Sequence, residues 1–298
     1  MSLVEDVGAA PALEVVGLTK RYGGTVALDD VSARFDRGQI VGLVGINGSG
    51  KSTLVKVVAG IEEPTHLGRL SFYGRDHVGP ITAAESQAYG LRVLHQRPAQ
   101  FLDLCVTENL LLPDIGRGRL GRFSWSAAHA EVRRMLEGVG LELDPRRRFS
   151  HYSPAQRTMA LVARLLHRGA DDDGQPRTLV LDEPTAALPE AEAIWLLDSL
   201  KTQKAAGHTI IYISHRLDEL FYVTDSLTVL RNGRLIESTS TAATDEQSLI
   251  TLLLGHEPEP PAVPSSTTSR EVGQVVPRLE VDGLAGDDAQ AIDLTVWP

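Results

Sequence analysis

The chain has 298 residues, of which 42% are hydrophobic and 23% are charged, an ordinary composition for a globular protein with one large α/β domain or two smaller ones. Its formal net charge of −10 argues against sequence-independent binding to nucleic acid, which requires a basic surface. The single cysteine, Cys105, excludes an intramolecular disulfide and suits a reducing compartment, and no run of about 18 apolar residues predicts a membrane span.

The first predicted elements lie before residue 60. Residues 12 to 35 alternate strand-favouring and polar residues around a turn at Tyr22-Gly23-Gly24, which predicts a short antiparallel sheet. The apolar run at 39–44 predicts a buried strand, and residues 52–59 have the composition of a helix. A glycine-rich loop joins this strand to this helix.

Residues 45 to 52 read Gly-Ile-Asn-Gly-Ser-Gly-Lys-Ser and fit the pattern G-x-x-x-x-G-K-[ST] at every fixed position. The glycines allow a tight curl in which successive N–H groups point at an anion. Lys51 can reach the β- and γ-phosphates of a nucleotide, and the Ser52 hydroxyl can bind Mg²⁺. The alternative is a chance glycine-rich turn, but with only five lysines in the chain a coincidental match has odds on the order of one in a hundred. The motif predicts a nucleoside triphosphate site formed by Gly45, Asn47, Gly48, Ser49, Gly50, Lys51, Ser52 and Thr53.

The middle of the chain alternates between helical and strand patterns. From about 97 to 168, and most clearly at 127–139 and 154–167, apolar residues recur at three- and four-residue spacing, which predicts helices. Short apolar runs at 178–181, 209–214 and 227–230, the last turning at Arg231-Asn232-Gly233, are typical of buried parallel strands. This order predicts a parallel sheet covered on both faces by helices. The acidic run at 171–174 is interpreted as a solvated loop, not a metal site.

The C-terminal part has a different composition. Residues 256–276 are rich in proline and serine, which predicts an extended linker. After it, residues 277–284 match residues 11–18 at six of eight positions, and residues 291–298 resemble the segment at 27–37. We therefore expect 277–298 to be the truncated start of a second copy of the N-terminal module, as in a longer tandem protein.

Four further motifs follow the glycine-rich loop in a fixed order. Gln96 follows a predicted strand at 91–95, and Tyr152-Ser153-Pro154-Ala155-Gln156 opens a predicted helix. Asp182-Glu183-Pro184 ends a predicted strand, and His215 follows the next one. With these motifs in this order, residues 12 to about 255 resemble the ATP-binding cassette (ABC) ATPases. The resemblance implies an α/β fold, a P-loop NTPase core of ABC type with an antiparallel β subdomain and an α-helical signature subdomain at about 97–168.

The resemblance also implies a role for each motif residue. Asp182 would hold Mg²⁺ through water, together with Ser52 and Gln96, and Glu183 would orient or deprotonate the attacking water. His215 would contact the γ-phosphate, and Tyr22 would stack on the adenine. Taken singly, each residue has a plainer explanation: a strand end, a surface histidine, or an aromatic ring packed near a turn. The implied cofactors are ATP and Mg²⁺.

Two positions depart from the family pattern. The family's usual signature, Leu-Ser-Gly-Gly-Gln, contacts the γ-phosphate bound on the opposite half of a dimer. Here residues 152–156 read Tyr-Ser-Pro-Ala-Gln instead. Pro154 lacks an N–H, so the donors expected to act in trans come from Ser153, Ala155 and Gln156. Pro189 stands where the family commonly has an aspartate.

The motif variants resemble those of the first half of tandem sugar-import ATPases of the ribose, xylose, arabinose or galactose type. This implies an ATPase that energises an importer, cytoplasmic and peripheral on the inner face of the cell membrane. Its partners would be transmembrane permease subunits, a second cassette and, indirectly, an external binding protein. Nucleoside and autoinducer importers share this layout.

Two other classes stay as alternatives. A soluble ABC-type ATPase working on DNA or ribosomes is disfavoured by the acidic charge and the absence of zinc-ligand cysteines, and we expect no nucleic acid partner. A nucleotide-binding regulator without hydrolysis is disfavoured by the intact Glu183 and His215, although the proline in the signature leaves room for it.

The family also predicts a surface for the permease. A groove beside the helical subdomain receives a short permease helix, which here would involve the segment 97–112, with Phe101, Leu102, Leu104 and Cys105 as apolar contacts. The alternative, held equally for Phe101 and Leu104, is that these side chains fill the core of the subdomain.

Overall fold

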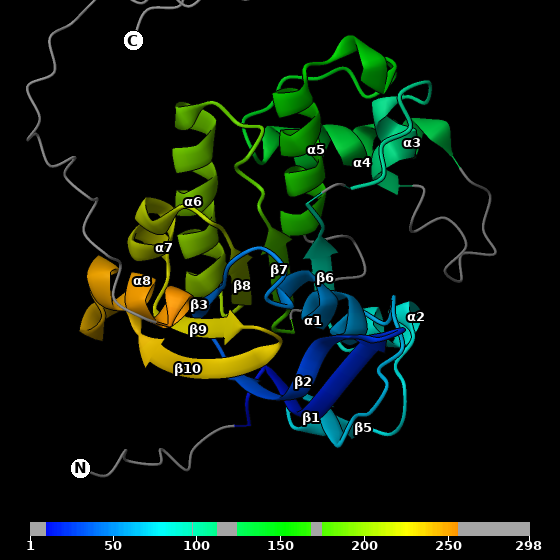
Figure 1. The fold of residues 1–298 in the computed structure, drawn as a ribbon. Helices are drawn as coiled ribbons and strands as arrows, with labels where there is room; N and C mark the ends of the chain where they lie inside the picture. The colour runs from blue at the N-terminus through cyan, green and yellow to red at the C-terminus, as the bar shows by residue number, and fades with distance from the viewer. Residues whose placement is uncertain (1–9, 97, 112–123, 168–174, 256–298) are drawn as a thin grey trace, which may run out of the picture. The chain divides into compact units, whose positions relative to one another are not determined.

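The computed structural model describes residues 10–96, 98–111, 124–167 and 175–255, and among these residues ten strands form two sheets (Figure 1). The predicted linker at 256–276, the predicted second copy at 277–298 and the acidic run at 171–174 lie outside the described residues. So do Arg97 and residue 168, which bound the predicted helical subdomain.

The smaller sheet is antiparallel, with the strand order β2-β1-β4-β5. Its first two strands, β1 (Leu13–Tyr22) and β2 (Thr25–Phe35), pair around the predicted turn, so the prediction for 12–35 is confirmed. The short strands β4 (Arg69–Phe72) and β5 (Arg75–His77) were not predicted. A helix α2 (Ala83–Ala88) follows, which begins with a Thr82–Glu85 capping box.

The larger sheet has six strands in the order β10-β9-β3-β8-β7-β6. The predicted buried strands are confirmed as β3 (Ile40–Val44), β6 (Leu91–Leu94), β7 (Thr178–Asp182), β8 (Thr209–Ile213) and β9 (Ser226–Arg231). These five are parallel to one another, whereas β10 (Arg234–Ser240) pairs antiparallel with β9 at the edge. Every residue of β3, β7 and β8 is buried, as expected for parallel strands covered on both faces.

Helices and the small sheet cover the two faces of this sheet. Along β3, Ile40 and Val44 belong to one apolar core, while Val41 and Leu43 belong to the other, as the two-residue period of a strand requires. The first core includes residues of α6 (Glu190–Ala205), α7 (Leu217–Val223) and α8 (Glu246–Leu254). The second includes residues of α1 (Lys51–Val58) and of the antiparallel sheet.

The segment between β6 and β7 is helical, as predicted, and contains α3 (Val106–Leu111), α4 (Trp125–Glu137) and α5 (Pro154–Leu166). Val106, Val132 and Phe149 are fully buried and join its parts into the first core.

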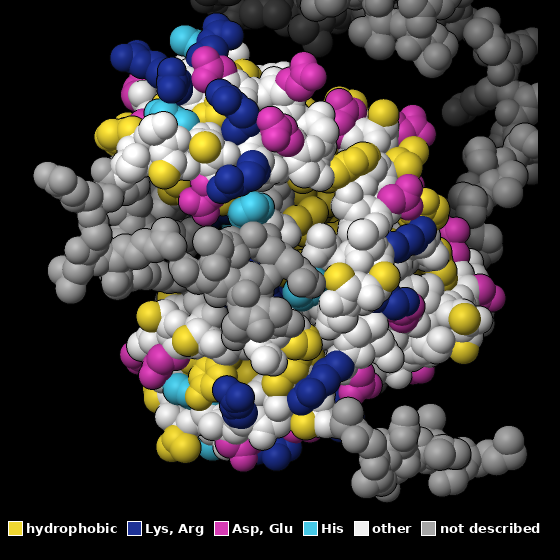
Figure 2. All heavy atoms as spheres, turned by 180° about the vertical axis from the view of Figure 1, so that it is seen from behind, with side chains coloured by type: hydrophobic (Ala, Val, Ile, Leu, Met, Phe, Trp, Pro, Cys, Tyr) yellow, Lys and Arg dark blue, Asp and Glu magenta, His cyan; other side chains and the backbone are white. Residues whose placement is uncertain are grey.

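Figure 2 shows Lys and Arg side chains gathered over this helical part of the molecule, with acidic side chains among them. The exposed arginines there include Arg133, Arg134, Arg146, Arg147 and Arg148. None of the described helices is both long and apolar enough to cross a membrane.

The topology brings the motifs together. Parallel strands end at the same edge of a sheet, and loops at that edge commonly form ligand sites. The loop at 45–50 follows β3, Gln96 follows β6 after one residue, Asp182 ends β7, and His215 follows β8 after one residue.

Candidate functional site

The glycine-rich loop 45–50 leads directly into α1. Gly48 and Gly50 have φ angles of 79° and 106°, which favour glycine. A Cβ atom at Gly45 would collide with the Ser49 hydroxyl and the Leu230 carbonyl, and one at Gly50 would lie 2.7 Å from the Ala27 carbonyl oxygen. No side chain caps the N-terminus of α1, so its first N–H groups and its positive dipole end face the loop. Such a cradle fits a phosphate.

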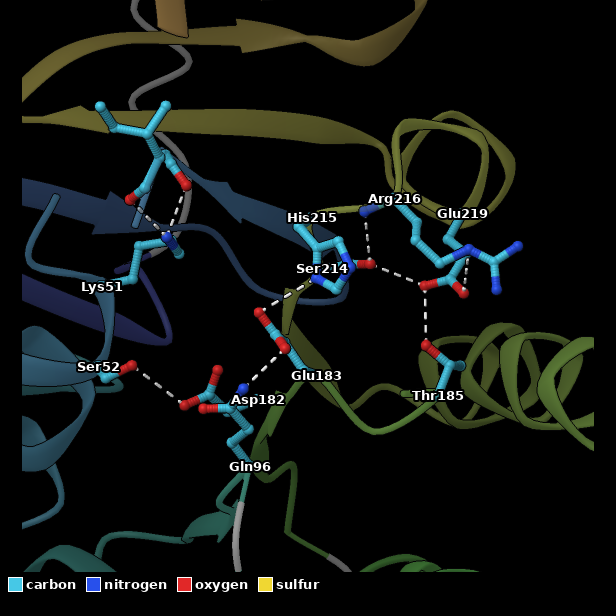
Figure 3. A network of polar contacts seen from close by, with 12 residues as sticks. Lys51, Ser52, Gln96, Asp182, Glu183, Thr185, Ser214, His215, Arg216 and Glu219 are labelled. Carbon is cyan, nitrogen blue, oxygen red and sulfur yellow. Dashed lines mark hydrogen bonds and ion pairs between the residues drawn. The ribbon is translucent and has the colours of Figure 1, made fainter. Parts of the chain in front are cut away.

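Lys51, the first residue of α1, folds back over this loop (Figure 3). Its Nζ atom donates to the carbonyl oxygens of Gly45 at 2.6 Å and Ile46 at 3.1 Å. Burial lowers the pKa of the Lys51 ammonium, an effect opposed by the negative charges of Asp182 and Glu183. The only cation of the motif is therefore held against the cradle and near two carboxylates.

Ser52 and Asp182 form the next contact of the site. The Ser52 hydroxyl donates to Asp182 Oδ2 at 3.3 Å, and Asp182 is 6% exposed. Burial raises the pKa of the Asp182 carboxyl, and the Ser52 hydrogen bond opposes this rise. Within the described ranges no three His, Cys, Asp or Glu side chains group as a metal site. A cation here would thus be held by hard oxygens from Ser52, Asp182 and a bound ligand, the donor type that Mg²⁺ prefers.

Glu183 connects the motif residues from three strands (Figure 3). Gln96 Nε2 donates to its Oε2 atom at 2.8 Å, and His215 Nδ1 lies 3.2 Å from its Oε1 atom. The backbone N–H of Glu183 donates to the Ile213 carbonyl at 2.9 Å, and its φ angle is 49°. A non-glycine residue in this left-handed region is strained, and such strain is concentrated at functional sites. The structure thus brings Gln96, Glu183 and His215 together; Gln96 reaches the site through its amide nitrogen.

A second carboxylate, Glu219, lies behind this group, and the motifs assigned no role to it. It is 4% exposed and accepts hydrogen bonds from the hydroxyls of Thr185, Tyr212 and Ser214. Burial, together with the Glu219 carboxylate that accepts its hydrogen bond, raises the pKa of Tyr212. The sequence signal was only an acidic residue four positions after His215, because Thr185 lies 34 positions before Glu219 and its approach depends on the fold.

Tyr22 lies at the end of β1, and its ring is 44% exposed. Its hydroxyl donates to Glu62, and Lys20 Nζ lies 4.8 Å from the ring centre. Burial and the Glu62 carboxylate raise the pKa of Tyr22, while an interaction with Thr53 on α1 lowers it. The ring is therefore beside the first turns of α1, with an exposed part available for stacking.

The signature segment forms the N-terminus of α5. Ser153 and Gln156 make a capping box, in which the Ser153 N–H donates to Gln156 Oε1 at 3.0 Å and the Gln156 N–H donates to Ser153 Oγ at 3.2 Å. Pro154 occupies the first helical position, where no N–H is needed. The N–H groups of Ser153 and Gln156 are thus engaged within the segment, and in the described part of the chain no hydrogen bond joins it to Lys51, Asp182 or Glu183. Pro189 lies at the N-cap of α6.

Comparisons with known proteins identify the family of the chain. The family described as "ABC transporter" matches residues 28–186. The chain is 33% identical to the ribose import ATP-binding protein RbsA 2 of Streptomyces avermitilis over 96% of the chain and 55% of that protein. It is 36% identical to the xylose import ATP-binding protein XylG of Moorella thermoacetica over 82% of the chain and 47% of that protein. The chain therefore spans about half the length of the curated relatives it matches.

Solved structures of similar fold are also ATP-binding cassettes. A nucleotide-free ATP-binding cassette from an ABC transporter matches with a TM-score of 0.67 and 26% identity, over 82% of this chain and 95% of that one. The ADP conformation of the cassette MJ1267 matches with a TM-score of 0.65 over the same shares. The expected P-loop fold of ABC type is confirmed.

Proposed function

The chain belongs to the ABC transporter family, and we propose that its cassette, residues 12–255, binds ATP with Mg²⁺ and hydrolyses it to drive a solute importer. The observation that carries this proposal is the Glu183 carboxylate, which lies between Gln96 and His215 beside the Lys51 loop. A nucleotide-binding regulator without hydrolysis would have no use for a strained carboxylate held between these two side chains.

The phosphate groups are assigned to the cradle formed by Gly45, Asn47, Gly48, Ser49 and Gly50, with Lys51 as the point charge and Tyr22 as the platform for the base. Lys51 would exchange its contacts with loop carbonyls for contacts with phosphate oxygens, which are stronger because both partners are charged. Ser52 and Asp182 would hold Mg²⁺, with the Gln96 amide oxygen as a further ligand; the ion supplies charge neutralisation when bound. Thr53 completes the first turn of α1 near the phosphates.

The hydrolytic step is assigned to Glu183. Its carboxylate would accept a proton from, or orient, the water that attacks the γ-phosphorus. The hydrogen bond from Gln96 fixes one carboxylate oxygen, and His215, 3.2 Å from the other, would donate from its second ring nitrogen to the γ-phosphate. The contact between Glu183 and His215 supports this assignment, because the reaction needs a base and a γ-phosphate donor close together.

A second cassette would complete the site in trans. Phosphoryl transfer needs donors around the transferred group, and the donors of Ser153, Ala155 and Gln156 start a helix that makes no hydrogen bond to this chain's own cradle in the described ranges. The capping box leaves the Ser153 hydroxyl hydrogen, the Ala155 N–H and the side-chain NH2 of Gln156 as the donors for a partner's nucleotide. Residues 256–276 are proposed as the linker toward such a cassette, and 277–298 as the beginning of its first strands.

The solute is proposed to be a monosaccharide, because the relatives RbsA 2 and XylG are ribose and xylose import proteins by name. The partners would be permease subunits, with a binding protein acting on the far side, and the cassette would lie on the inner face of the membrane. Importers of nucleosides or autoinducers share this layout and are the second candidate. Co-expression with the permease, followed by ATPase assay in vesicles with each loaded binding protein, separates these solutes.

The permease surface is proposed around Phe101 and Leu102, which are 54% and 44% exposed. Because the Phe101 side chain is exposed, the alternative that it fills the subdomain core is wrong. Leu104 and Cys105 are half-buried. Arg97 and Leu112, the ends of the predicted segment, lie outside the described residues. Asn109 holds the loop in place by accepting from the Phe101 N–H at 2.8 Å and donating to its carbonyl at 2.9 Å.

Substitution of Phe101→Asp is expected to abolish assembly with the permease while ATP binding stays unchanged, because a charged side chain cannot enter an apolar contact without a large desolvation cost. Co-purification with the tagged permease measures assembly. Ile194→Asp is the matched control, since Ile194 on α6 is 47% exposed and lies outside the proposed surface. Normal co-purification of the Phe101 variant would remove this surface from the interface.

A further inference from the structure

We propose that Glu219 is a positioning residue for hydrolysis, which holds the segment of Glu183 and the segment of His215 in register. This inference rests on the proposed function, because it assigns the hydrolytic step to Glu183 and His215. Among the described residues, no hydrogen bond or ion pair joins Glu219 to the Glu183 or His215 side chain, so it would act only through the loops that carry them.

The evidence begins with the three donors to the carboxylate. Glu219 Oε2 accepts from Tyr212 OH at 2.7 Å, from Ser214 Oγ at 2.8 Å and from Thr185 Oγ1 at 3.0 Å. Tyr212 lies on β8, and Ser214 lies directly before His215. Thr185 lies two residues after Glu183. One buried oxygen therefore joins both loops of the site, through Thr185 and Ser214 (Figure 3), and also contacts Tyr212 on β8.

The turn around His215 is fixed on both sides. Ser214 Oγ donates to Glu219 and also accepts from the Arg216 N–H at 3.1 Å. Arg216 Nε lies 3.3 Å from Glu219 Oε1, an ion-pair distance without hydrogen-bond geometry. Glu219 thus holds the residues before and after His215. The His215 side chain itself is 65% exposed.

The loop after Glu183 is fixed in the same way. Thr185 is 4% exposed and donates its hydroxyl to Glu219, and the Leu188 N–H donates to the Thr185 carbonyl at 2.9 Å. Glu183 has a left-handed φ of 49°, a conformation that persists only where surrounding contacts enforce it. Thr185 supplies one of these contacts on its C-terminal side, and the Ile213 carbonyl supplies another at its N–H.

A carboxylate is the group that this position requires. A buried charge is tolerated only when hydrogen bonds and an opposite charge compensate it, and here three hydroxyls and the Arg216 guanidinium do so. An amide in its place keeps one acceptor oxygen, but it loses the attraction to Arg216 and presents N–H groups to a cation. Because a neutral amide oxygen accepts hydrogen bonds more weakly than a carboxylate oxygen, Glu219→Gln weakens the link to both loops without changing the volume of the side chain.

The test uses the 298-residue chain with Glu219→Gln. We expect the single-turnover rate constant for ATP hydrolysis to fall roughly tenfold to a hundredfold, the cost of a displacement of reacting groups by about 1 Å, while the Kd for ATP changes less than about threefold. Because Glu219 acts through both Glu183 and His215, adding Glu219→Gln to the variant that carries Glu183→Gln and His215→Ala should slow hydrolysis no further. A general loss of fold would instead lower binding and rate together.

Two further variants keep the test decisive. Ser214→Ala and Thr185→Val each remove one hydroxyl and leave the carboxylate in place, so each should slow hydrolysis less than Glu219→Gln does. Asp225→Asn is the control, because Asp225 accepts from the Ile40 N–H at 2.8 Å where β3 begins, at the end of the strand away from the site. The rate of hydrolysis by this variant should stay normal. A wild-type rate for Glu219→Gln, or a loss that persists when both Glu183→Gln and His215→Ala are present, would overturn the inference. If Glu183→Gln also keeps the wild-type rate, the proposed function fails, which is a separate outcome.

Discussion

Glu183→Gln is expected to reduce ATP hydrolysis by roughly two to four orders of magnitude, the contribution of a positioned general base, while ATP binding remains. The amide has the shape of the carboxylate but cannot accept a proton from water, and its N–H groups would face the Gln96 amide nitrogen now 2.8 Å from Oε2. The phosphate cradle at 45–52 makes no hydrogen bond with Glu183 in the described structure, so it should keep its geometry.

The measurement is single-turnover hydrolysis at saturating Mg²⁺·ATP, with the Kd determined separately by a fluorescent nucleotide analogue. Glu190→Gln is a suitable control, because Glu190 is an exposed carboxylate in the first turn of α6. A turnover of the Glu183 variant within a few-fold of wild type would mean that another group activates the water.

Lys51→Ala is expected to weaken ATP binding by about two orders of magnitude or more, since hydrogen bonds to charged groups contribute about 1.5–3 kcal/mol each and Lys51 can reach two phosphates. The same change removes a partly buried cation that the negative charges of Asp182 and Glu183 attract, so the repulsion between these carboxylates and the nucleotide increases. At ATP concentrations near the wild-type Kd, hydrolysis should fall to near zero because little substrate binds.

The control for this change is Lys56→Ala on the same helix. Lys56 is half-exposed and pairs with Glu62 at 3.1 Å, and such surface ion pairs contribute little. Isothermal titration with Mg²⁺·ATP should therefore give wild-type affinity for the Lys56 variant. Equal affinities for the Lys51 variant and wild type would place the phosphates elsewhere.

Several parts of the fold could be predicted because they depend on local sequence. The buried strands β3, β7 and β8 are continuous runs of apolar residues, and the turn between β1 and β2 contains two adjacent glycines. The strands β4 and β5 have only four and three residues, and Arg75-Asp76-His77 shows no apolar pattern. They form strands because β4 pairs with β1, a contact between residues more than 50 positions apart.

The candidate site was predictable to the same degree. Motif order placed Gln96, Glu183 and His215 at the edge of one sheet, where the structure finds them in contact. The Glu219 network was not predictable, because the Thr185 hydroxyl after β7 and two hydroxyls at the end of β8 must converge on one buried oxygen. The exposure of Phe101 was equally undetermined, since an aromatic residue in a loop packs inward or outward according to its neighbours.

The central claim is that residues 12–255 form one ATP site that requires a second cassette for fast hydrolysis. It is tested most directly by measuring ATP turnover of the 298-residue chain against ATP and protein concentration, together with sedimentation velocity. We predict that the chain binds Mg²⁺·ATP, stays mainly monomeric and hydrolyses slowly with a hyperbolic dependence on ATP, because its signature helix, with Pro154 at the first position, makes a poor donor for a second copy of itself. Fast, sigmoidal turnover by an ATP-dependent homodimer would contradict this claim.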